Sequence, residues 1–158
     1  MNTHAFASHD HQHCVSTAMA AAEEFCQANR LQFTPVRRRV LEILLSQHKA
    51  MGAYEILPML AEEGLGSQPP VIYRALDFLV KHKFVHKIER LNAYIACSHS
   101  GKDHTPAFMI CRSCTRVEEM DSRPSVGLNA AAENTGFTIE ATVIEAEGLC
   151  PDCQDTPE

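Results

Sequence analysis

Four of the seven cysteines form two C-x-x-C pairs, Cys111/Cys114 and Cys150/Cys153. Two residues between the cysteines let both thiolates of a turn point at one ion, and two such turns complete a tetrahedral zinc site. Thirty-five residues separate the pairs, which is room for a helix and a strand. Because four protein thiolates leave no open position on zinc, we expect a structural ion. One or two redox disulfides are the alternative interpretation.

A second group of potential ligands lies in the middle of the chain. Each member has a simpler explanation on its own, as a surface histidine, a buried free cysteine or a solvated acid. Their place between two predicted domains would suit a metal ion that holds one domain against the other. Spacing alone leaves both interpretations open for this group, which comprises His86, Cys97, His99, His104, Glu118 and Glu119.

Zinc enzymes are the alternative class of function. A nucleobase deaminase needs a His-x-Glu motif and a proline directly before C-x-x-C. Leu149 precedes Cys150, Ile110 precedes Cys111, and the sequence holds no His-x-Glu. A thiol oxidoreductase needs a cysteine of low pKa at a helix N-terminus, which neither pair clearly offers. We therefore expect no enzymatic activity and no small organic substrate.

Composition sets the broad class of the protein. The 158 residues suffice for one ordinary domain or two small ones, and a hydrophobic content of 45% supports packed cores. No apolar run approaches the roughly 20 residues that span a bilayer. The first 14 residues carry four histidines and lack the pattern of a signal peptide. We expect a soluble, cytoplasmic protein without a membrane partner.

Charge divides the chain into two unlike parts. Residues 1–93 hold ten Lys or Arg against nine Asp or Glu, whereas residues 94–158 hold four against eleven. Only the first part is therefore suited to a phosphate backbone. Eight of these ten basic residues form a group from which phosphate contacts could come, namely Arg37, Arg38, Arg39, Lys49, Arg74, Lys81, Lys83 and Lys87.

The elements of residues 16–96 have the order of a winged helix-turn-helix. Apolar periodicity and capping signals predict helices over 16–29, from Thr34-Pro35, over 53–63 and from Pro69-Pro70. Two β-prone runs, 84–89 and 92–97, predict a hairpin. A small helical domain with an unrelated hairpin is the alternative. Tyr73 and Arg74 fall on the first turn of the predicted fourth helix, off its apolar stripe, where a recognition helix reads bases.

A different pattern follows residue 100. Strands at 107–110 and 117–120 flank the first cysteine pair, and a helix is predicted over 124–134 with Gly136 as its stop. Phe137 to Glu145 alternates apolar and polar residues, which predicts a half-buried strand. The fold class is therefore α+β: an N-terminal winged helix-turn-helix domain followed by a small α/β domain. Pro58, inside the predicted third helix, is the one local conflict.

Several motifs occur in a fixed order, namely Thr34-Pro-Val-Arg37, Ala53-Tyr54, Val71-Ile-Tyr-Arg-Ala-Leu76, Phe84-Val-His-Lys87 and the two C-x-x-C pairs. Together they resemble the ferric-uptake-regulator superfamily and, within it, the zinc-uptake regulators. The resemblance covers about residues 16–153. It implies a zinc-responsive repressor of zinc-uptake genes that binds double-stranded operator DNA as a homodimer. The domains would be a flexible His-rich tail (1–15), a DNA-binding domain (16–96), a hinge (97–106) and a dimerisation domain (107–158).

The resemblance also assigns site residues. The positions that hold the regulatory zinc in relatives match His86, Cys97, His104 and Glu119. One thiolate, two imidazoles and one carboxylate suit tetrahedral zinc, so we expect two zinc ions per monomer, one structural and one regulatory. Tyr54 and Arg74 match positions that contact DNA, and we add Arg37 and Tyr73 from their places on the predicted helices. Whether His99, Glu118 or the N-terminal histidines form a further site stays open.

Overall fold

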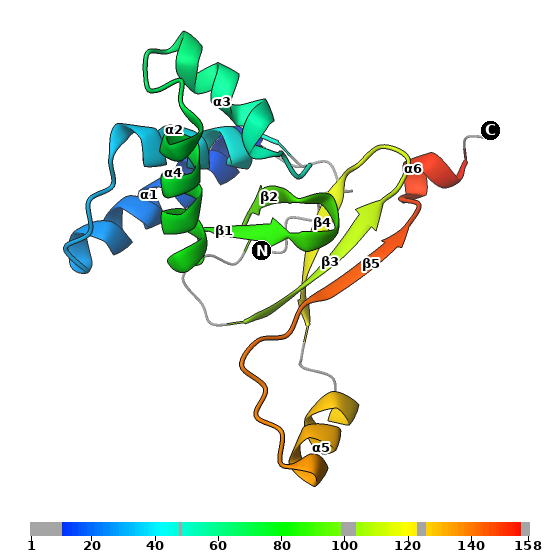
Figure 1. Cartoon of the computed structure of the whole chain (residues 1–158). Coiled ribbons are helices and arrows are strands. Elements are labelled where there is room, and N and C mark those ends of the chain that lie inside the picture. Colours follow the sequence, from blue (N-terminus) through cyan, green and yellow to red (C-terminus); the bar gives the residue numbers. More distant parts are fainter. Residues whose placement is uncertain (1–10, 48, 99–103, 123–125, 156–158) are drawn as a thin grey trace.

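The computed structural model describes residues 11–47, 49–98, 104–122 and 126–155 (Figure 1). Four helices come first, namely α1 (His11–Ala28), α2 (Pro35–Leu45), α3 (Ala53–Glu62) and α4 (Pro69–Lys81). An antiparallel hairpin follows, with β1 (Val85–Ile88), the 3-10 turn η1 (Glu89–Leu91) and β2 (Ala93–Ala96). The C-terminal part contains β3 (Thr105–Cys111), β4 (Val117–Ser122), α5 (Val126–Thr135), β5 (Ile144–Gly148) and α6 (Pro151–Gln154). This order confirms the predicted α+β class.

Local signals explain why α2 begins where it does. Thr34 is the N-cap, and its hydroxyl accepts a hydrogen bond from the Arg37 amide at 3.4 Å. Pro35 occupies the first helical position, where its missing N–H costs nothing. The helix then buries Val40, Leu41, Ile43 and Leu44 in the core of the N-terminal domain.

The recognition-helix candidate α4 begins at Pro69 as predicted, and its buried face consists of Ile72, Ala75, Leu76 and Leu79. Tyr73 and Arg74 are exposed on the opposite side. They lie on the second turn of α4, not on the first turn as predicted. They are the fifth and sixth residues of a helix that begins at Pro69, and one turn holds 3.6 residues, so the predicted start of the helix was right and only the assignment to the first turn was wrong.

The hairpin is joined to the helices by a third extended segment. Met51 and Tyr94 exchange two backbone hydrogen bonds of 2.8 Å, so residues around Met51 pair with β2. Asn92, at φ +45°, lets the chain turn sharply from η1 into β2. We call β1, η1 and β2 the wing.

The C-terminal sheet has the order β4-β3-β5, with β4 antiparallel and β5 parallel to β3. A separate apolar cluster joins this sheet to the wing. It contains Ile88 and Ile95 of the wing packed with Phe108, Ile110 and Val117 of the sheet. Figure 1 shows the hairpin lying against the sheet, whereas α5 projects away from it.

Three predicted boundaries differ from the structure. First, α1 begins at His11, so residues 11–15 of the predicted tail are helical, because Val15 continues the apolar stripe of Met19, Ala22 and Cys26. Residues 1–10, with His4 and His9, lie outside the described residues. Second, β3 starts at Thr105, so the last two residues of the predicted hinge belong to the sheet.

Third, the strand predicted over 137–145 is wrong for most of its length. Residues 137–143 have no regular secondary structure, and β5 begins only at Ile144. Phe137 and Val143 are 69% and 60% exposed. An alternating segment forms a strand only if a neighbouring strand satisfies its backbone hydrogen bonds. Pairing with β3 begins only at Ile144, so the residues before it do not form a strand. Within the described part of the chain, no helix is long and apolar enough to cross a membrane.

Candidate metal centres

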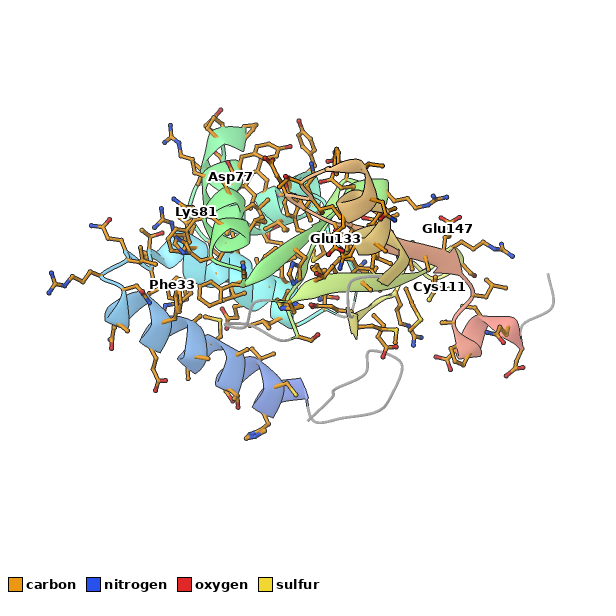
Figure 2. All side chains as sticks on the ribbon, turned by 90° about the horizontal axis from the view of Figure 1, so that it is seen from below. Phe33, Asp77, Lys81, Cys111, Glu133 and Glu147 are labelled. Atoms are coloured by element: carbon orange, nitrogen blue, oxygen red, sulfur yellow. The ribbon has the colours of Figure 1, made fainter. Side chains whose placement is uncertain are left out.

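Sheet pairing brings the two C-x-x-C pairs together. Cys111 ends β3, and Cys114 lies in the turn that leads to β4. Parallel pairing places Gly148 of β5 beside Cys111, and two residues later the chain reaches Cys150, the N-cap of α6. Figure 2 shows Cys111 and Glu147 on adjacent strands at this end of the sheet.

The spacing of the four sulfur atoms fits one tetrahedral ion. All four lie within 4.8 Å of one another, and the Cys114 and Cys150 sulfurs are 3.7 Å apart. A regular tetrahedron with Zn–S bonds of about 2.3 Å has S–S edges of about 3.8 Å. We call Cys111, Cys114, Cys150 and Cys153 the four-cysteine site.

The pKa values of two thiols of this site shift in opposite directions. Backbone hydrogen bonds from Cys114 and Cys150 lower the pKa of the Cys111 thiol to about 6. Burial, in contrast, raises the pKa of the Cys150 thiol to about 12. Without a cation, adjacent thiolates repel one another, so a divalent ion is what would let all four ionise.

One argument against a thiol oxidoreductase needs correction. Cys150 does lie at a helix N-terminus, as the N-cap of α6. However, α6 has only four residues and the pKa of Cys150 is raised, which is the opposite of what a reactive cysteine requires.

A second cluster is assembled from four different segments. It contains His86 from β1, Cys97 directly after β2, His104 directly before β3 and Glu119 from β4, with one ligand atom of each within 4.8 Å of the others. We call these residues the junction site, because the first two come from the wing and its end and the last two from the sheet. These are the four residues that the resemblance assigned.

Most close contacts within the junction site involve one oxygen of Glu119, and the Cys97 sulfur also lies 3.6 Å from His104 Nε2. Glu119 Oε1 lies 2.6 Å from His104 Nε2, 3.1 Å from His86 Nε2 and 3.6 Å from the Cys97 sulfur. The His86 Nε2 atom is buried and, despite the short distance, is not aligned for a hydrogen bond. A buried ring nitrogen without a hydrogen-bond partner is costly, and a metal ion would satisfy it.

Glu119 remains a carboxylate in this environment. Burial raises its pKa, but the nearby His86 ring and hydrogen bonds from the Ser98 amide and the His104 ring outweigh burial and lower the pKa to about 2. Ser98, which sequence analysis missed, donates its amide and hydroxyl to Oε2 at 2.9 and 3.2 Å. Such outer contacts orient a metal ligand. Only the proximity of Ser98 to Cys97 could have suggested this role.

Of the two open candidates, Glu118 and His99, the structure describes only Glu118. Glu118 is 5% exposed but belongs to neither cluster, because adjacent strand residues point to opposite faces of the sheet. His99 lies outside the described residues.

The candidate DNA-contacting residues lie in two environments. Tyr54 is 74% exposed on α3, and Tyr73 and Arg74 are exposed on α4. Arg37 is instead engaged within the protein, since its guanidinium lies 3.7 Å from the Phe78 ring centroid and donates to the Gln32 carbonyl.

Comparison with known proteins gives concordant matches. The sequence model of the ferric uptake regulator family matches residues 28–146. The zinc uptake regulation protein of Escherichia coli (strain K12) is 39% identical over 137 residues, covering 85% of this chain and 80% of that protein.

Solved structures agree with these matches. A zinc uptake regulator complexed with zinc and DNA has a TM-score of 0.84 at 36% identity, covering 89% of this chain and 95% of that chain. Holo XcZur has a TM-score of 0.78 at 38% identity, covering 87% and 97% of the two chains. Apo XcZur, with the same identity and 89% and 97% coverage, has a TM-score of only 0.50.

Proposed function

We propose that this chain, which belongs to the ferric uptake regulator family, is a zinc-responsive transcriptional regulator. It binds operator DNA as a zinc-loaded homodimer and represses zinc-uptake genes. Membership of a family of regulators agrees with the prediction that the chain is not an enzyme. The similar proteins include a zinc uptake regulation protein and a regulator complexed with zinc and DNA, which supports this assignment.

The observation that carries the proposal is the junction site. Its ligand atoms come from both domains, so they converge only while the wing lies on the sheet. A zinc ion at this site would link β1 to β4 and balance the two negative charges of Cys97 and Glu119. The fold here is more similar to holo than to apo XcZur, which fits an arrangement that metal binding favours.

The response to zinc then follows from linkage. A ligand shifts a conformational equilibrium only by its difference in affinity for the two states. In the docked state all four junction ligands are within reach, whereas a wing that has left the sheet takes His86 away from Glu119. Zinc therefore favours the docked state, and DNA that fits this state raises the affinity for zinc by the same factor.

The four-cysteine site would hold the second ion of each monomer, with a structural role. It joins the end of β3 to α6 through side chains that the short α6 could not position alone. Because binding energy at such a site is folding energy, removing this ion should unfold the C-terminal part of the chain.

Exposed residues fit the two proposed partners. Tyr73 and Arg74 on α4 and Tyr54 on α3 would contact the operator.

The acidic C-terminal part would face away from DNA and form the dimer. Leu128, Phe137 and Val143 expose apolar surface there, and α5 projects from the sheet without a cover in Figure 1. A second copy would bury this surface.

Replacing Cys97 by Ser tests the proposal. We expect Cys97→Ser to abolish zinc-dependent binding to operator DNA while the protein stays a folded dimer, because only the junction site is altered. The matched control is Cys14→Ser, since Cys14 lies on α1 and belongs to neither cysteine-containing cluster. Operator binding should be measured by fluorescence anisotropy in zinc buffers. If Cys97→Ser kept the zinc dependence of the control, the regulatory assignment would be wrong.

A further inference from the structure

The turn of the wing is held by two acidic residues of β5. The Glu89 and Arg90 amides, at the start of η1, donate to the two carboxylate oxygens of Glu145 at 2.8 and 3.1 Å. The Arg90 guanidinium donates to both carboxylate oxygens of Glu147 at 2.8 and 3.0 Å. Each pair of parallel bonds to a carboxylate is charge-assisted and specific in geometry.

These contacts lie across the sheet from the junction site. Strand register places Glu119, Phe108 and Glu145 side by side on β4, β3 and β5. The next row on the same face holds Val117, Ile110 and Glu147, because side chains two residues apart share a face. The wing therefore rests on a central apolar patch, with the junction site at one edge and the two glutamates at the other.

We propose that Glu145 and Glu147 form an acidic latch that holds the wing turn on the sheet and so lowers the zinc concentration needed for DNA binding. This inference rests on the proposed function, since it concerns regulation at the junction site. The two glutamates are positioning residues: they contact neither the junction ligands nor the exposed face of α4.

The latch favours the DNA-competent arrangement because it is formed in that arrangement. The structure with the latch closed is similar to a regulator complexed with zinc and DNA and to holo XcZur. Bonds present only in the docked state add to its stability, so less zinc is needed to populate that state. Hydrogen bonds from Arg90 also lower the pKa of Glu147, as expected for an ion pair.

If net charge alone mattered, neutralising Glu145 and Glu147 would strengthen DNA binding, whereas the latch predicts that it weakens DNA binding. A protein with two fewer negative charges is generally attracted more strongly to DNA. The latch instead predicts that Glu145→Gln with Glu147→Gln raises the free zinc concentration at half-maximal operator binding by roughly three- to tenfold. The matched control is Glu140→Gln, an exposed acid before β5 with no hydrogen bond or ion pair among the described residues. We call the free zinc concentration at half-maximal operator binding the zinc half-point. In the Glu140→Gln control the zinc half-point should be unchanged or slightly lower.

A charge exchange separates the latch from a direct DNA contact by Arg90. Arg90→Glu and Glu147→Arg should each raise the zinc half-point, and the double exchange should restore most of the loss, since the ion pair re-forms with reversed sign. If Arg90 acted by binding phosphate, the double variant would stay as weak as Arg90→Glu. That result would refute the proposed role of the ion pair between Arg90 and Glu147 in the latch.

Hydrogen exchange tests the latch without reference to DNA. In zinc-loaded wild-type protein, the Glu89 and Arg90 amides should exchange at least severalfold more slowly than in the Glu145→Gln/Glu147→Gln variant. Equal exchange rates, or a half-point in the double variant no higher than that of wild type, would overturn the latch. A wild-type protein without any zinc response would instead refute the proposed function, and exchange at these two amides would still decide whether the latch exists.

Discussion

The two carboxylate oxygens of Glu119 have different partners, and this division defines the chemistry of the junction site. Oε2 is occupied by Ser98, whereas Oε1 points toward His86, His104 and Cys97. The side chain can therefore offer one oxygen to an ion without losing the contacts that hold it in place. The carboxylate is only 2% exposed, and its burial is tolerated because Ser98, His104 and Cys97 make hydrogen bonds to it.

The low pKa of Glu119 gives a prediction about acid. The folded-state pKa of about 2 lies below the ordinary value of 4.5, so the ionised group stabilises the fold above about pH 4.5, and this contribution is lost as the pH falls toward 2. In protein lacking the regulatory ion, carbon-13 NMR should therefore show Glu119 ionised throughout pH 7.5 to 5. The Glu119→Gln variant identifies the resonance. An inflection within that range would mean that burial dominates and the predicted hydrogen bonds are absent.

At the scale of single elements, α3 tolerates a residue that should interrupt it. The helix continues from Ala53 to Glu62 through Pro58, which is exposed. An interior proline removes the bond to the carbonyl four residues earlier, here that of Tyr54. The buried residues Ala53, Ile56 and Leu60 keep the helix on the core in spite of this loss.

We expect Pro58→Ala to raise the free energy of unfolding by about 1–3 kcal/mol, because alanine restores the bond to the Tyr54 carbonyl. The control is Pro70→Ala in the first turn of α4, where no N–H is needed and little gain should follow. Urea unfolding followed by circular dichroism measures both. A Pro58→Ala variant that is no more stable than wild type would show that α3 already accommodates the proline by other means.

Sequence patterns predicted most helices well because their signals are local. Thr34-Pro35 and Pro69-Pro70 mark the starts of α2 and α4 through N-capping and a preset φ. The two C-x-x-C pairs likewise predict the turns in which they lie. The predicted strand over 137–145 failed because a strand depends on a partner far away in the chain, and alternation cannot reveal where pairing begins.

The junction site shows the same limit. Spacing marked six candidate ligands but could not select four, since His86 and Glu119 meet only through the docking of the wing on the sheet. Resemblance to a family made that selection. Neither approach found Ser98 or the acidic latch, because a serine and two glutamates on a surface strand carry no motif.

The whole molecule combines a half of nearly neutral charge, which we propose binds DNA, with an acidic half that would form the dimer. Among the described residues, the contacts that join the wing to the sheet include the junction site, the apolar cluster around Phe108 and the acidic latch. All three depend on the same docked position of the wing. A change in any of them should therefore alter DNA binding without touching the surface that meets DNA.

The central claim is that occupancy of the junction site controls DNA binding, and one titration tests it directly. Zinc per chain and operator binding should be measured on the same samples as free zinc is buffered upward. We predict a first, tightly held ion at zinc levels where the operator is not bound, followed by a second ion whose binding curve coincides with operator binding. Full operator binding with one ion per chain, or a second ion that leaves operator affinity unchanged, would contradict the account.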